Sequence, residues 1–128
     1  MITVVAALIR MDNKILIAKR LTGDRYVIGK WEFPGGKVEL NETEEESIER
    51  EIKEEFEIDV KVIKFLKNNI CSYPNKIIDL RLYECEYLSG DIKLYDHLEY
   101  KFISIDEFIN YDFAPADIPF IEYLMQNK

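Results

Sequence analysis

The 128-residue chain has only two cysteines, and its basic residues are fewer than its acidic ones. Cys71 and Cys85 form no Cys-x-x-Cys arrangement, which argues against a disulfide framework and predicts two reduced thiols on strands. The 17 basic residues against 25 acidic ones give a net charge of −8. This charge argues against a nucleic acid polymer or an anionic membrane surface as a partner.

Long hydrophobic runs are also lacking. The N-terminal stretch ITVVAALIR (residues 2–10) holds the most apolar sequence, and no basic segment precedes it. A run of this length predicts a strand rather than a signal peptide or a membrane span. We therefore expect a cytoplasmic protein. With 48% hydrophobic residues, the chain is predicted to form one globular domain over residues 1–128.

Hydrophobic periodicity and turn signals divide the chain into short elements. Strands are predicted at residues 2–10, 14–20, 58–70, 76–88 and 99–105, with turns at Asp12-Asn13 and Tyr73-Pro74-Asn75. A capping box of Ser104 and Glu107 opens a short helix, and residues 115–128 predict another. Strands and helices do not alternate regularly, so we expect an α/β fold with a mixed sheet flanked by helices.

The most informative segment is the acidic stretch at residues 43–56, which predicts a helix. Glu51, Glu54 and Glu55 then share one face, beside an apolar face that carries Ile48, Ile52 and Phe56. Like charges at i,i+4 cost a helix about 0.2 to 0.5 kcal/mol per pair. A hard divalent cation, Mg²⁺ or Mn²⁺, would offset this cost, because such ions prefer oxygen ligands.

An acidic run of this kind is also typical of the solvated face of an amphipathic helix. The turn WEFPGGKVE directly before it favours the metal site instead. Gly35 and Gly36 allow a backbone carbonyl to approach a metal without side-chain interference. An EF-hand is excluded, because its calcium-loop pattern is absent from the sequence.

Residues 36–58 resemble the box of the Nudix family, which reads G-x5-E-x7-R-E-U-x-E-E-x-G-U with U an apolar residue. Gly36, Glu42 and the run from Arg50 to Ile58 match it at every required position except Glu57, where the family usually carries glycine. That glycine sits where the helix ends and favours a left-handed conformation. We therefore expect a different helix exit at Glu57, with the site intact.

The resemblance implies a Nudix-type α/β/α sandwich and an enzyme that hydrolyses nucleotides with Mg²⁺. It implies that Glu51, Glu54 and Glu55 are metal ligands, with the carbonyl of Gly35 or Gly36 as a further oxygen. Arg50 would orient a glutamate, and Glu42 would pair with Arg50 across the loop.

Some members of this family take a further carboxylate from a later loop, and Asp96 has the spacing that this requires. Glu99 is the alternative. His97, the only histidine of the chain, is interpreted as a polar surface residue of this loop. The general base is left open among Glu51, Glu54 and Asp96.

Over its whole length the chain looks most similar to MutT-like members of the (deoxy)CTP pyrophosphohydrolase type, which release pyrophosphate and a monophosphate. The segment FAPADIP places Asp117 where the MutT group usually has an asparagine that contacts oxidised guanine. An ionised carboxylate only accepts hydrogen bonds, so Asp117 suits the amine of cytosine better than O6 of 8-oxoguanine.

Other side chains are predicted near the nucleotide. Phe33, Tyr73 and Phe113 are candidates to stack on the base, although each also suits ordinary packing. Arg20 and Lys76 lie where similar enzymes hold cations near the nucleotide. Glu32 interrupts an apolar Trp31-x-Phe33 segment and is expected to face the pocket.

We therefore expect a nucleoside triphosphate pyrophosphohydrolase that prefers cytidine or modified deoxycytidine nucleotides. One alternative is an 8-oxo-dGTP diphosphatase that cleans the nucleotide pool. A second is a catalytically silent Nudix module that senses a ligand, although this chain keeps all three glutamates. Either a monomer or a homodimer is compatible with the sequence, and residues 2–10 could be an edge strand that pairs between subunits.

Overall fold

The computed structural model describes residues 1–23 and 25–128, and within these ranges seven strands form one mixed sheet. The strands are β1 (Ile2–Met11), β2 (Lys14–Arg20), β3 (Trp31–Glu32), β4 (Gly35–Lys37), β5 (Asp59–Tyr73), β6 (Lys76–Ser89) and β7 (His97–Ile103). Their order is β3-β2-β1-β6-β5, while β4 pairs with β1 and β7 pairs with β2. Only β1 and β6 run parallel among these pairs, so the predicted mixed sheet is confirmed.

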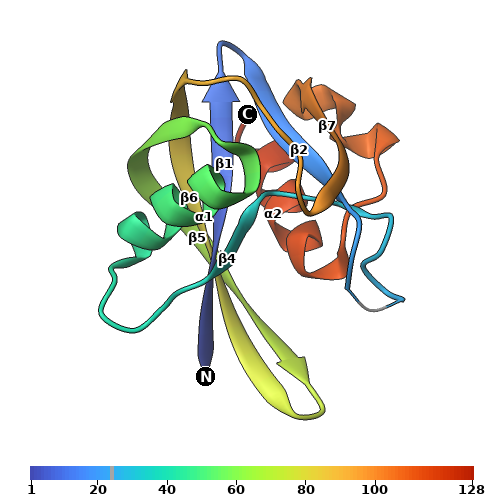
Figure 1. Ribbon diagram of the computed structural model, residues 1–128. Coiled ribbons are helices and arrows are strands. Elements are labelled where there is room, and N and C mark those ends of the chain that lie inside the picture. The colour runs from blue at the N-terminus through green and yellow to red at the C-terminus, as the bar shows by residue number, and fades with distance from the viewer. Residues whose placement is uncertain (24) are drawn as a thin grey trace.

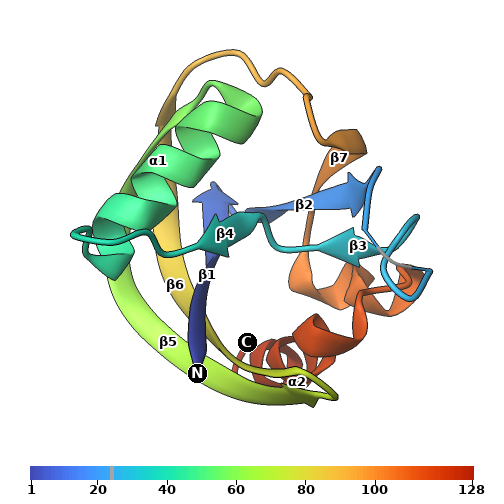
Figure 2. The same ribbon diagram turned by 60° about the horizontal axis from the view of Figure 1, so that its bottom comes forward.

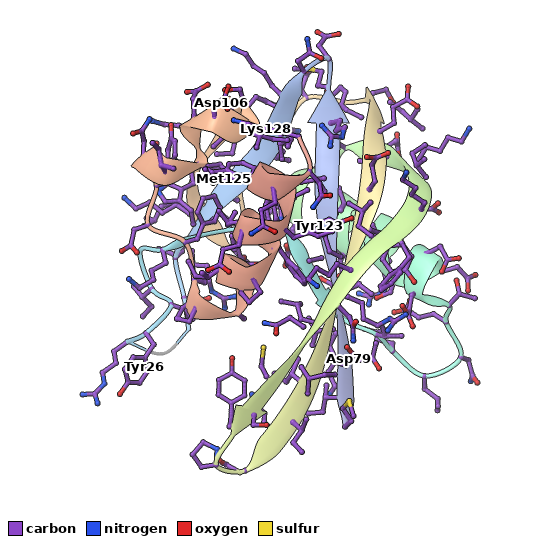
Figure 3. The ribbon with its side chains drawn as sticks, turned by 180° about the vertical axis from the view of Figure 1, so that it is seen from behind. Tyr26, Asp79, Asp106, Tyr123, Met125 and Lys128 are labelled. Carbon is purple, nitrogen blue, oxygen red and sulfur yellow. The ribbon has the colours of Figure 1, made fainter. Side chains whose placement is uncertain are left out.

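Helices cover both faces of the sheet, as Figures 1 and 2 show. One face carries α1 (Glu44–Phe56), and the other carries α2 (Ile118–Gln126) with the 3₁₀ helices η1 (Ile105–Asn110) and η2 (Pro115–Asp117). Figure 3 views the second face, where Tyr123 and Met125 project from α2. This arrangement is the α/β/α sandwich that was expected. No helix of the described residues is long and apolar enough to span a membrane.

Alternation along β1 builds two separate cores. Val5, Ala7 and Ile9 point toward α1, whereas Ala6 and Leu8 point toward α2 and η1. From the helices, Ile48, Ile52 and Phe56 enter the first core, and Phe108, Phe120 and Leu124 enter the second. Each such side chain contributes about 1.5 to 3 kcal/mol when buried, so α1 is held firmly against the sheet.

Strand β1 lies inside the sheet, so the edge-strand hypothesis for residues 2–10 is wrong. It pairs with β6 from Ile2 to Arg10, and with β4 at Val4–Ala6. The predicted hairpin with β2 is present at Arg10↔Ile15 and Met11↔Lys14. Asp12 takes a φ of 57° in its turn. Because β1 and β2 pair only near this turn, β4 occupies the place beside the first half of β1.

Both ends of α1 follow from local sequence. Thr43 caps its start through a capping box with Glu46. At its end, Glu57 adopts the left-handed conformation (φ 57°, ψ 30°), and its N–H donates to the Lys53 carbonyl at 3.0 Å. The expectation of a different helix exit was therefore wrong. Phe56 and Ile58 on either side are buried, and their packing offsets a left-handed backbone that costs a non-glycine residue about 1 to 2 kcal/mol.

A long twisted hairpin of β5 and β6 extends beyond the rest of the sheet (Figure 1). Its strands pair from Asp59↔Ser89 to Tyr73↔Lys76, around the turn that the sequence predicts. Cys71 and Cys85 lie on these strands as free thiols, which confirms the prediction for both. The hairpin carries Cys71 and Tyr73 toward the site described next.

Candidate functional site

Two adjoining cavities open where β3, β4 and the start of β1 meet. The first, here called the acidic cleft, has a volume of about 330 Å³ and is lined by Arg20, Thr22, Glu32, Gly35, Gly36, Lys37, Glu51, Glu55, Asp96 and His97. The second, here called the apolar cavity, has a volume of about 200 Å³. Its lining comprises Val4, Val5, Ala6, Arg20, Val27, Glu32, Phe33, Gly35, Gly36, Cys71, Tyr73, Ile78, Leu80, Ala114, Ala116 and Asp117.

The two cavities share part of their walls. Arg20, Glu32, Gly35 and Gly36 line both of them. Arg20 donates from Nη1 to Glu32 Oε1 at 3.0 Å, so one ion pair stands at the boundary. A ligand with a charged part and a flat apolar part can therefore occupy both cavities at once.

Arg50 organises the carboxylates of α1. Its Nη1 lies 2.9 Å from Glu51 Oε1 and 3.2 Å from Glu54 Oε2, which is one helical turn away at i+4. Its Nε and Nη2 donate to the two oxygens of Glu42 at 3.0 and 2.8 Å. The predicted pairing of Glu42 with Arg50 is therefore present, and Nη2 is fixed further by the Lys37 carbonyl at 3.2 Å.

The hydrogen bonds between Glu42 and Arg50 shift the pKa values of both groups. Hydrogen bonds from the Arg50 guanidinium lower the pKa of Glu42 from 4.5 to about 2. The same bonds raise the pKa of Arg50 well above its ordinary value. Both groups therefore stay ionised at neutral pH, and Arg50 is held in one orientation beneath the metal-binding candidates.

Glu55 is the most perturbed carboxyl of the acidic cleft. Burial, together with the negative charges of Glu51, Glu32 and Asp96, raises its pKa from 4.5 to about 8. Its Oε2 is buried and makes no hydrogen bond to any described residue. Burial also raises the pKa of Glu51. A buried carboxyl without a partner, among three further carboxylates, fits a place for a cation.

Among the described residues, no three Asp, Glu, His or Cys side chains converge closely enough to enclose a metal ion as they stand. Glu51 and Glu54 instead share the guanidinium of Arg50, and Glu54 points largely into solvent. The donor set nevertheless fits a hard divalent cation, since it offers carboxylate oxygens and an orphaned buried oxygen on Glu55.

The two glycines of β4 have different neighbours. A Cβ on Gly36 would lie 2.3 Å from Glu51 Cδ and 2.5 Å from both of its carboxylate oxygens. A Cβ on Gly35 would lie 1.9 Å from the backbone oxygen of Val5 on β1. Gly36 thus leaves space for a carboxylate of the acidic cleft, whereas Gly35 allows β4 to pack on β1.

His97 is buried, so its interpretation as a polar surface residue is wrong. It begins β7 with only 6% of its surface exposed, and its Nε2 lies 2.8 Å from Glu32 Oε2. The interpretation failed because a partner 65 positions away in the sequence gives no local signal. Its neighbour Asp96 lines the acidic cleft, while Glu99 pairs with Lys19 and is absent from the lining of either cavity among the described residues.

The apolar cavity gathers the residues predicted near a base. Phe33, Tyr73 and Asp117 line it, although Phe33 is almost fully buried and Tyr73 is largely exposed. Phe113 instead packs in the core against Phe33, at a ring distance of 5.8 Å. Among the described residues Phe113 is not part of the cavity wall, and it contributes to the core by ordinary packing.

Asp117 is 5% exposed, and no described residue forms a hydrogen bond with its side chain. Burial, together with the negative charge of Glu32, raises its pKa well above the ordinary value, and Arg20 acts in the opposite direction. A raised pKa favours the protonated carboxyl, whereas a hydrogen-bond donor placed beside it would favour the ionised form.

Lys76 lies at the turn of the hairpin. Its Nζ stands 5.7 Å from the ring centre of Tyr73, and it lines neither cavity among the described residues. The sequence also missed most of the small and apolar residues of the cavity wall, among them Val27, Cys71 and Ala116. Neither charge nor spacing marks these small or apolar side chains, so only the fold shows that they belong to the cavity.

A family model and known proteins match the chain over most of its length. A model of the NUDIX domain matches residues 1–124. The "CTP pyrophosphohydrolase" of Escherichia coli is 36% identical over 125 residues, which are 98% of this chain and 92% of that protein. The "8-oxo-dGTP diphosphatase" of Buchnera aphidicola is 34% identical and covers 96% of this chain and 92% of its own length.

Solved structures show the same similarity. The solution structure of the E. coli ORF135 protein superposes with a TM-score of 0.85 at 35% identity, covering 98% of this chain and 89% of that one. The crystal structure of a MutT protein from Methanosarcina mazei also has a TM-score of 0.85, at 29% identity, with 98% and 94% coverage.

Proposed function

This chain belongs to the Nudix family of hydrolases, and we propose that it is a cytoplasmic enzyme that hydrolyses cytidine triphosphates to the monophosphate and pyrophosphate. Modified deoxycytidine triphosphates belong to the same proposed substrate class. The observation that carries this proposal is the pair of adjoining cavities with the Arg20–Glu32 ion pair at their boundary.

The acidic cleft suits the polyphosphate of such a substrate when a cation is bound. We assign Glu51, Glu54 and Glu55 as its side-chain ligands, with the carbonyl of Gly35 or Gly36 as a further oxygen, and Mg²⁺ or Mn²⁺ as the ion. When bound, such an ion neutralises phosphate charge and increases the acidity of water.

The remaining chemistry falls to the side chains of the protein. Arg50 orients Glu51 and Glu54 through a guanidinium that Glu42 fixes from the other side. Arg20 faces both cavities and supplies positive charge to the substrate phosphates. Glu51, Glu54 and Asp96 are the carboxylates proposed to accept the proton of the attacking water.

The apolar cavity suits the base. Phe33 and Tyr73 offer aromatic surface to it, and Asp117 offers a buried carboxyl that has no hydrogen-bond partner among residues 1–23 and 25–128. The exocyclic amine of cytosine is a donor, so its hydrogen bond would satisfy Asp117 and favour the ionised form. The O6 atom of 8-oxoguanine is an acceptor and would be repelled by an ionised Asp117.

Substitution of Asp117 by asparagine tests this part of the proposal, because the amide keeps the shape but adds a donor for O6. We expect Asp117→Asn to reduce the preference for CTP over 8-oxo-dGTP, measured as the ratio of kcat/KM values, by about tenfold or more. Asp91→Asn makes the same chemical change as a matched control, because Asp91 is exposed and lines neither cavity among the described residues. An unchanged ratio in Asp117→Asn would remove Asp117 from base selection.

A second candidate substrate is 8-oxo-dGTP, because several relatives carry the name 8-oxo-dGTP diphosphatase. This candidate uses the same acidic cleft and differs only in the base that occupies the apolar cavity. The Asp117→Asn comparison therefore also separates the two.

A further inference from the structure

The single histidine of the chain lies between the two cavities and the helix that carries the acidic residues. His97 has only 3% of its side chain exposed, and its Nε2 contacts Glu32 Oε2 at 2.8 Å. Its ring stacks on Phe56, which follows Glu55 on α1, with ring centres 5.1 Å apart and an angle of 22°. His97 therefore joins α1 to β3 by one stacking contact and one hydrogen bond.

The direction of this hydrogen bond follows from its partner. A carboxylate can only accept, so the shared proton belongs to Nε2 of the imidazole. Nδ1 of His97 is buried and has no hydrogen-bond partner among the described residues. Only the bond to Glu32 therefore fixes the tautomer of the ring.

Glu32 is held from two sides, since Arg20 donates to Oε1 and His97 to Oε2. This carboxylate lines both the acidic cleft and the apolar cavity. Its negative charge is felt by a carboxyl in each of them, Glu55 and Asp117. A change in the position of Glu32 would thus alter phosphate binding and base selection together.

We propose that His97 is a positioning residue that fixes the Glu32 carboxylate at the boundary of the two cavities and thereby sets substrate affinity and base preference. This inference rests on the proposed function, because it assigns the boundary to a bound nucleotide. The alternative is that His97 only fills space against Phe56.

Two substitutions of His97 separate positioning from space filling. His97→Phe keeps an aromatic ring for Phe56 but removes the donor, whereas His97→Gln loses the ring but keeps an N–H group. We expect His97→Phe to raise KM for CTP about tenfold with kcat changed less than about threefold, and His97→Gln to restore KM to within about threefold of the wild type. A wild-type KM in His97→Phe, or a larger defect in His97→Gln than in His97→Phe, would overturn the proposal.

A double-mutant comparison tests whether His97 acts through Glu32. Glu32→Gln alone should raise KM, and adding His97→Phe to Glu32→Gln should change KM by less than about twofold, because the positioned carboxylate is already gone. If the two substitutions instead raise KM by independent factors that multiply in the double variant, the proposal is contradicted. Thermal unfolding of each variant identifies those that fail to fold.

A spectroscopic measurement tests the contact without any substrate. Because the chain has one histidine, a long-range ¹H–¹⁵N spectrum reports its tautomer directly. We expect the Nε2–H tautomer with a slowly exchanging ring proton in the wild type, and loss of that protection in Glu32→Leu, which has no acceptor for this proton. An Nδ1–H tautomer in the wild type, or protection that persists in Glu32→Leu, would overturn the proposal. If the wild type hydrolyses no nucleotide, the proposed function fails, while this spectrum still decides whether His97 holds Glu32.

Discussion

The acidic cleft and the apolar cavity adjoin, yet the sequence encodes them in different ways. The three glutamates proposed as metal ligands, Glu51, Glu54 and Glu55, come from one helix, and Gly36 on β4 leaves room for Glu51. The apolar cavity is assembled from β1, β3, β4, the β5–β6 hairpin and η2, which are far apart in the chain. The comparison teaches that the proposed metal ligands share one short segment, whereas the proposed cavity for the base exists only after folding.

If the metal ligands and the base cavity act separately, substitutions in α1 should abolish turnover without changing which base is preferred. Glu54→Gln removes a proposed metal ligand, and we expect kcat to fall more than about a hundredfold. Glu54 is mostly exposed, so the thermal midpoint should remain near that of the wild type. Glu49→Gln is the control, because Glu49 is exposed on the same helix but is not among the described carboxylates that contact Arg50. Near-normal turnover in Glu54→Gln, or a changed base preference in its residual activity, would contradict the separation.

Gly35 and Gly36 of β4 test the comparison further, because their neighbours differ. In Gly36→Ala the new methyl group displaces the carboxylate of Glu51, so we expect kcat to fall about thirtyfold with little loss of stability. In Gly35→Ala the methyl group meets the backbone of β1, so we expect unfolding to become easier by about 2 kcal/mol or more. Kinetics and urea denaturation on both variants check this. The opposite pattern, with stability lost in Gly36→Ala alone, would mean that Gly36 serves packing.

The pH dependence of stability tests the cleft without substrate. The pKa of Glu55 in the folded protein is about 8, against an ordinary value of 4.5. Folding then favours the protonated carboxyl, so the contribution to stability is fully present below about pH 4.5 and is lost as the pH rises toward 8. In the presence of a metal chelator, we expect the free energy of unfolding to fall by about 1 to 2 kcal/mol over this pH range. This figure allows for solvent screening, because the Glu55 side chain is partly exposed.

Urea denaturation between pH 5 and 8.5 measures this loss, and Glu55→Gln should remove it. The raised pKa of Asp117 contributes in the same direction, so Asp117→Asn is the matched comparison for the apolar cavity. A wild-type profile that rises with pH over this range would show that the cleft does not destabilise the Glu55 carboxylate.

Local sequence predicted most elements of the fold and the three glutamates on one face of α1. The helix at 43–56 and both hairpins depend on contacts within a few residues or one short loop, whereas the pair of Glu42 with Arg50 was implied by the resemblance to the Nudix box. His97 and Glu57 were misjudged, because their states depend on tertiary packing. His97 is buried by a distant glutamate, and the left-handed exit at Glu57 is stabilised by buried neighbours rather than by a glycine.

The most direct test of the account is a screen of the wild-type protein with Mg²⁺ against ordinary, 5-modified cytidine and 8-oxo-guanine triphosphates. Pyrophosphate and nucleoside monophosphate are detected separately. The account predicts a strong preference for cytidine triphosphates, with one pyrophosphate and one monophosphate released per turnover. A preference for 8-oxo-dGTP would contradict the role given to Asp117, and the absence of turnover with every triphosphate would contradict the proposed reaction itself.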